Sequence, residues 1–138
     1  MGKKISEVMT SNPATVDASA PVLEAARLMR DQDVGLAPVV EAGRLVGTLT
    51  DRDIAIRVVA EGKDAQSTTV GDIASKDLVT LDPAQDLQEA VRLMAQHQVR
   101  RLPVVEEDGR LVGVVAQADV AQAAGDSETG QMVQDISQ

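Results

Sequence analysis

The chain has 138 residues, 43% of them hydrophobic and 25% charged, and its 22 acidic and 13 basic residues give a formal net charge of −9. These values are typical of one globular unit of ordinary domain size, and the acidic balance disfavours binding to nucleic acid or to an anionic membrane surface. The absence of Phe, Trp, Tyr and Cys and the presence of one histidine, His97, exclude aromatic base stacking, disulfides, thiol nucleophiles and a multi-histidine metal centre.

The N-terminal residues, 1–6, lack the apolar stretch of a secretory signal. No later run reaches the roughly eighteen apolar residues of a membrane span. We therefore expect a cytoplasmic protein that does not enter a membrane.

Apolar spacing and turn residues predict helices and strands in the first half of the chain. Pro21 suits the first position of a helix, and Val22, Ala25, Ala26 and Met29 follow on one helical face. The same pattern recurs later in the chain at Leu87, Ala90, Val91 and Met94. Two short β-branched runs, 36–40 and 45–49, flank a glycine-containing turn and predict a hairpin, and a second helix is predicted from about Asp51 to Gly62.

The chain repeats itself. Residues 8–41 match 73–106, and residues 42–54 match 108–120 after the single insertion of Glu107, with 18 identities in 47 aligned pairs. A repeat of this length indicates a supersecondary unit that buries its apolar face against its twin. We predict an α+β fold with unit 1 at 5–62, a linker at 63–69, unit 2 at 70–124, and a tail at 125–138 that forms a short helix.

The first candidate site lies where the second strand of unit 1 enters a helix. Thr50 offers a hydroxyl, the helix start offers unpaired amides for a phosphate, and the Asp53 carboxylate can accept two ribose hydroxyls. The alternative is structural, because Thr50 or Asp51 also suits a helix N-cap.

The second candidate site is the pair Arg100 and Arg101 before a strand of unit 2. Unit 1 has Gly35 and Leu36 at the same place, and core packing does not demand arginine in one copy alone. The alternative is a solvated strand start with weak surface ion pairs. His97, at a helix end, suits the helix dipole better than catalysis.

The strands Ala37-Pro38-Val39-Val40 and Leu102-Pro103-Val104-Val105, each followed by Gly-Arg-Leu-Val-Gly and an Asp-bearing helix start, resemble a tandem pair of cystathionine β-synthase (CBS) domains. The resemblance covers residues 5–124 and is to the small stand-alone bacterial form. It implies a Bateman module, in which two helix-strand-strand-helix units, each with a short extra leading strand, pack sheet to sheet. Such modules bind adenine nucleotides in the clefts between the units and pair into disc-like homodimers.

The resemblance also implies roles for particular residues. In the main cleft, Thr50 and the pair Arg100 and Arg101 would contact phosphate and Asp53 the ribose. The residues that would border the base there are Lys76, Leu78, Val79 and Thr80. The second and weaker cleft would use Asp119, Ala14 and Thr15, with Ala116 in place of the hydroxyl residue and Gly35 and Leu36 in place of the arginines.

We therefore predict a non-enzymatic sensor that binds AMP, ADP, ATP or a related adenine nucleotide as a regulatory ligand, without cofactor or metal, and signals to a protein in trans. The competing prediction is a ligand-independent scaffold that binds a protein through its acidic surface and its predicted C-terminal helix. An enzyme is disfavoured because a lone histidine and unclustered carboxylates provide no paired acid and base.

Overall fold

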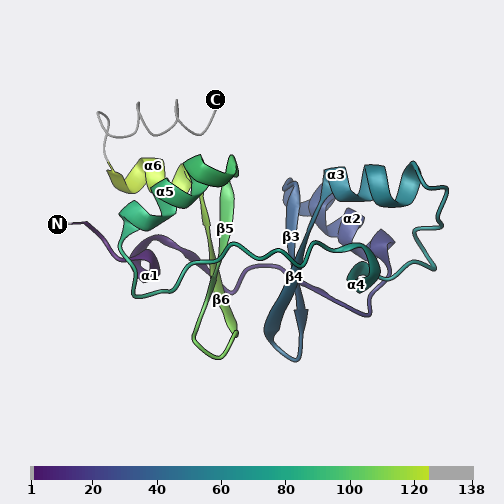
Figure 1. Ribbon diagram of the computed structural model, residues 1–138, viewed down its shortest axis with the longest axis horizontal. Coiled ribbons are helices and arrows are strands. Elements are labelled where there is room, and N and C mark those ends of the chain that lie inside the picture. Colours follow the sequence, from purple (N-terminus) through teal and green to yellow (C-terminus); the bar gives the residue numbers. More distant parts are fainter. Residues whose placement is uncertain (1, 125–138) are drawn as a thin grey trace. The chain divides into compact units, whose positions relative to one another are not determined.

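The computed structural model describes residues 2–124, which form two compact units (Figure 1). One unit is Ala14–Leu78, here the 14–78 unit. The other, here the 79–124 unit, combines residues 2–13 with residues 79–124. Each unit has its own three-stranded sheet and its own apolar core. The tail helix predicted at 125–138 concerns residues outside the described part of the chain.

The 14–78 unit is built on the sheet order β2-β3-β4, in which β3 runs parallel to β2 and antiparallel to β4. Ala42 and Gly43 both have positive φ, 53° and 80°, and close the predicted hairpin between β3 and β4. Helices α2 and α3 pack on this hairpin and on each other. The elements are β2 (Val16–Asp17), α2 (Val22–Gln32), β3 (Leu36–Glu41), β4 (Arg44–Thr50), α3 (Asp51–Ile54), the π-helix η1 (Ala55–Val59) and α4 (Val70–Ile73).

The 79–124 unit has the sheet order β1-β6-β5, with both pairings antiparallel. Helices α5 and α6 lie side by side at the end of the β5–β6 hairpin that is opposite its turn (Figure 1). The elements are α1 (Ile5–Val8), β1 (Thr10–Ser11), α5 (Leu87–His97), β5 (Arg101–Val105), β6 (Leu111–Ala116) and α6 (Gln117–Ala124).

The leading segment of each sequence repeat is divided between the two units. In the first repeat, Thr10 of β1 pairs with Val114 of β6, whereas β2 pairs with β3 of its own repeat. The second repeat shows the same division, because Ser75 bridges Thr48 of β4 while Leu81 bridges Val104 of its own repeat. The compact units are therefore offset from the sequence repeats, and the chain passes from one unit to the other at 13/14 and at 78/79.

Both long helices bury most of the face that their spacing predicts, while Ala26 and Val91 of these faces are half-buried. Val22, Ala25 and Met29 of α2 are buried, as are Leu87, Ala90 and Met94 of α5. Helix α2 begins at Val22 rather than at Pro21, because Pro21 has an extended ψ of 150° and forms a β-bridge with Thr69. No helix in residues 2–124 is long and apolar enough to cross a membrane.

Gly47 marks a close approach of the chain to β4. A Cβ atom at Gly47 would lie 2.9 Å from the carbonyl oxygen of Ser75 and 3.2 Å from the Ala74 side chain. Because a backbone atom cannot move aside as a flexible side chain does, we expect Gly47→Ala to lower the free energy of unfolding by about 1–3 kcal/mol. Urea unfolding checks this, with Gly2→Ala as the control because nothing lies within 4 Å of that position. Equal stabilities of the two variants would contradict the expectation.

Candidate functional site

Thr50 and Asp53 form a reciprocal capping box at the point where β4 enters α3. The Asp53 backbone N–H donates to Thr50 Oγ1 at 3.0 Å, and the Thr50 backbone N–H donates to Asp53 Oδ2 at 2.9 Å. The structure thus shows the structural alternative for Thr50, in which its side chain caps the helix that begins at Asp51. It leaves Asp53 Oδ1 as a further acceptor on a side chain that is 18% exposed.

Arg57 is a residue of this site that sequence reasoning missed. Its Nε lies 3.9 Å from Asp53 Oδ1, and its Nη1 donates to the carbonyl oxygen of Ile73 at 2.8 Å. A signal for the first contact was present, because an acid and an arginine four residues apart lie on one helix face. The contact with Ile73, sixteen residues away, has no such signal.

The stretch predicted to border a base spans the change from one unit to the other. Lys76 and Leu78 are exposed in the 14–78 unit, where Lys76 Nζ donates to the carbonyl oxygen of Gly71 at 3.0 Å. Leu78 is 39% exposed, which is high for a leucine. Val79 and Thr80 are half-buried in the 79–124 unit and lead into Leu81.

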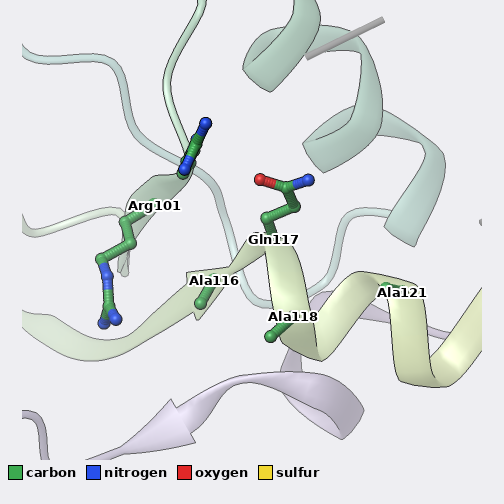
Figure 2. A pocket seen from close by; sticks show the side chains of 6 residues that line it. Arg101, Ala116, Gln117, Ala118 and Ala121 are labelled. Atoms are coloured by element: carbon green, nitrogen blue, oxygen red, sulfur yellow. The ribbon is translucent and has the colours of Figure 1, made fainter. Parts of the chain in front are cut away.

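Arg100 and Arg101 lie next to the beginning of α6, within the 79–124 unit. The Gln117 backbone N–H donates to the Arg100 carbonyl oxygen at 2.7 Å, which ties the start of α6 to the start of β5. Figure 2 shows Arg101 on β5 and the short side chains of Ala116 and Ala118 at the junction of β6 and α6. A pocket of about 380 Å³ is lined here by Arg100, Arg101, Ala116, Gln117, Ala118 and Ala121.

The charged side chains that line this pocket are those of Arg100 and Arg101, and Asp119 lies in the first turn of the adjacent α6. Within residues 2–124, neither guanidinium group of Arg100 or Arg101 forms an ion pair or a side-chain hydrogen bond. The same backbone bond occurs at the equivalent place of the 14–78 unit, where the Asp51 N–H donates to the Gly35 carbonyl oxygen at 3.0 Å. A side chain at Gly35 would crowd the Asp51 carboxylate, which lies 3.2 Å from an ideal Cβ. Both helix starts carry an acidic residue in the first turn, and the units differ in having Gly35 and Leu36 at one start and Arg100 and Arg101 at the other.

The residues predicted for the weaker site also belong to different units. Asp119 Oδ2 accepts the Ala116 backbone N–H at 2.9 Å, which is half of a capping box because Ala116 has no hydroxyl. Ala14 and Thr15 are exposed and precede β2 in the 14–78 unit. Just beyond them, the backbone N–H and then the hydroxyl of Ser19 lower the pKa of Asp17.

The two helix starts allow a reciprocal test of the cap. We expect Thr50→Ala to lower the free energy of unfolding by about 1 kcal/mol, because the Asp53 N–H loses its acceptor. Ala116→Thr should raise it by up to about 1 kcal/mol, since it completes the box at Asp119. Urea unfolding of the nucleotide-free variants measures both. Changes in the same direction would contradict the assignment of a complete cap to one helix and a half cap to the other.

The class of protein follows from the repeated strand-hairpin-helix unit and its family model. The model for the CBS domain matches residues 5–60 and 70–126, so the chain belongs to the CBS domain family. The predicted α+β fold with two CBS units is confirmed.

Particular relatives are similar over most of the chain. The CBS domain-containing protein YhcV of Bacillus subtilis is 49% identical over 85% of this chain and 82% of its own length, and Hypoxic response protein 1 of Mycobacterium tuberculosis is 38% identical over 84% and 81%. The crystal structure of Hypoxic Response Protein I with two coordinated zinc ions has a TM-score of 0.80 at 37% identity, covering 87% of this chain and 98% of that one. The structure of CBSX2 in complex with AMP has a TM-score of 0.78 at 28% identity, covering 89% and 96%.

The two coordinated zinc ions belong to the structure of Hypoxic Response Protein I. In residues 2–124, no group of three or more His, Cys, Asp or Glu side chains is arranged to hold a metal ion. His97, the histidine of the sequence, is exposed at the end of α5.

Proposed function

We propose that this CBS pair is a non-enzymatic regulatory module that binds an adenine nucleotide. The observation that carries the proposal is the pocket lined by Arg100 and Arg101 together with the short side chains of Ala116, Ala118 and Ala121, where neither guanidinium group has a partner in residues 2–124. In a chain of net charge −9, such a place suits a phosphate. The AMP complex of CBSX2, a relative at 28% identity, supports the choice of ligand class.

In the proposed main site, Asp53 takes the ribose and Thr50 assists at the phosphate. Asp53 suits the ribose because its carboxylate is held by the cap through Oδ2 while Oδ1 keeps its capacity to accept hydroxyl groups. Arg100 and Arg101 supply the charge for the phosphate. Each charge-assisted hydrogen bond of this kind contributes on the order of 1.5–3 kcal/mol.

The base is assigned to the stretch Lys76, Leu78, Val79 and Thr80. The exposed side chain of Leu78 offers apolar surface, and the backbone of this stretch offers hydrogen-bonding groups for the edge of the base. An aromatic stacking partner is not needed for this mode of binding.

The second proposed site, with Asp119, Ala14 and Thr15, binds more weakly. Ala116 lacks the hydroxyl of Thr50, and Gly35 and Leu36 stand where unit 2 has its arginines. The loss of one arginine bond and one hydroxyl bond costs about 2.5–4 kcal/mol, which is roughly a hundredfold to nearly a thousandfold in affinity.

The module acts on a protein in trans, and we propose that it does so as a homodimer in the cytoplasm. Exposed apolar side chains support a protein-contact surface on the α3–η1 segment, where Ile56 is 47% and Val59 71% exposed. Sedimentation at several concentrations, with and without AMP, tests the dimer, and a monomer under all conditions would contradict it.

Thermal unfolding with a panel of AMP, ADP, ATP and adenosine tests the function. A nucleotide present at a hundred times its Kd stabilises the folded chain by about 2.7 kcal/mol, which raises the melting temperature by several degrees. GMP is the control for the base. The absence of a shift with every adenine nucleotide would contradict the proposal and favour a ligand-independent scaffold.

A further inference from the structure

We propose that Arg57 is a positioning residue of the nucleotide site. This inference rests on the proposed function and adds to it a side chain that joins two parts of the site within the 14–78 unit. Arg57 Nε faces Asp53 Oδ1 at 3.9 Å, and Nη1 donates to the carbonyl oxygen of Ile73 at 2.8 Å. One end of this contact is the proposed ribose acceptor, and the other is the end of α4, three residues before Lys76.

The segment that follows Ile73 is fixed to β4. The Ser75 N–H donates to the Thr48 carbonyl oxygen at 2.9 Å, and the Thr48 N–H donates to the Ser75 carbonyl oxygen at 3.0 Å. Gly47 allows this close approach, as its contact distances show. Because β4 ends at Thr50, Arg57 and the Thr48–Ser75 bridge tie the 74–78 part of the proposed base stretch to the helix start that carries Asp53, within the 14–78 unit.

The π-helix gives Arg57 its place in this arrangement. The Ala60 N–H donates to the Ala55 carbonyl oxygen at 2.9 Å, five residues back, so the turn that carries Arg57 is wider than an α-helical turn. Such turns are often found at functional sites. In the second repeat, the same shift of 66 residues aligns Arg57 with Ala123, so Asp119 has no equivalent arginine.

The arrangement assigns a definite task to Arg57. The Thr50 N–H fixes Asp53 Oδ2, and the Arg57 Nε lies 3.9 Å from Oδ1, so the two contacts together set how the carboxylate is turned. A ribose bound to Asp53 and a base bound at 76–78 are then positioned by the same side chain. Arg57 therefore acts on ribose and base recognition and not on the phosphate, which is assigned to Arg100 and Arg101.

The experiment compares Arg57→Gln and Arg57→Lys with Arg44→Gln. The control removes the same charge from an exposed position at the far end of β4. Calorimetry with AMP and with 2′-deoxy-AMP gives two affinities for each variant. We expect Arg57→Gln to raise the Kd for AMP about tenfold, because Asp53 and the 74–78 segment lose the side chain that positions them, and to reduce the preference for AMP over 2′-deoxy-AMP. Arg57→Lys should restore part of the AMP affinity and part of the preference for AMP over 2′-deoxy-AMP. Arg44→Gln should have the same affinity and preference as the unchanged chain.

Hydrogen exchange in the absence of nucleotide provides a second readout. In Arg57→Gln, the amides of residues 74–78 should exchange several-fold faster, because the end of α4 loses its contact with Arg57. If the unchanged chain binds AMP but Arg57→Gln matches Arg44→Gln in affinity, deoxy preference and exchange, the inference is overturned while the proposed function stands. If the unchanged chain binds no adenine nucleotide, the proposed function fails, and with it the assignment of Arg57 to a ligand. Arg57→Lys keeps the charge and decides the matter if Arg57→Gln does not fold.

Discussion

Replacing Asp53 with asparagine is expected to weaken AMP binding by about 10- to 100-fold, as for the loss of one charge-assisted hydrogen bond to the ribose. Asparagine keeps the shape of the side chain, and its amide oxygen can still accept the N–H of Thr50, so the cap of α3 survives. What is lost is the ionised Oδ1, which is the acceptor assigned to the ribose hydroxyls. Calorimetric titration with AMP measures the change.

The matched control is Asp119→Asn, which makes the same substitution at the equivalent position of the second repeat. Asp119 also accepts a backbone N–H at its own helix start, so the structural cost of the two substitutions is similar. We expect Asp119→Asn to change the AMP affinity less than about threefold, well below the loss of a charge-assisted bond. If Asp119→Asn strongly lowered the AMP affinity and Asp53→Asn did not, the main site would have to be assigned to the start of α6 instead.

The second large effect is expected from the double variant Arg100→Gln with Arg101→Gln. Two charge-assisted bonds to phosphate are removed together, so the AMP affinity should fall at least a hundredfold. Adenosine, which has no phosphate, should bind this variant and the unchanged chain almost equally. The ratio of the AMP and adenosine affinities therefore isolates the contribution of the two arginines from any general loss of folding.

The control for this variant is the pair Arg30→Gln with Arg44→Gln, which removes the same charge at exposed positions of α2 and β4. It should leave the ratio unchanged. An equal fall in both double variants would show that net charge, and not the pocket at Arg100 and Arg101, governs binding.

The helices and hairpins could be predicted because their signals are local. The stripe of Val22, Ala25 and Met29 and the turn at Ala42 and Gly43 are each complete within one stretch of chain, and the repeat doubles every such signal. The division of the leading segments was not predicted. Helices α1 and α4 are four residues long and β1 is two, so their partners are chosen by tertiary pairing rather than by local pattern.

The π-helix also escaped prediction, because the apolar residues of 54–59 do not distinguish hydrogen bonds to the fourth residue from those to the fifth. In the candidate site, the spacing of Thr50 and Asp53 predicted both a cap and a ligand contact. The structure shows the cap, while the ligand contact stays a prediction. Arg57 was missed because half of its role depends on Ile73, which only the fold brings near.

The most direct test of the account is calorimetric titration of the full chain with AMP. We predict saturable binding with a stoichiometry near one AMP per chain. The reason is that the complete cap at Thr50 occurs only in the first repeat and the arginine pair Arg100 and Arg101 only in the second. Titrations with ADP and ATP, which carry the same adenosine group, extend the measurement to longer phosphate chains. A titration that shows no saturable binding of AMP, ADP or ATP would contradict the account.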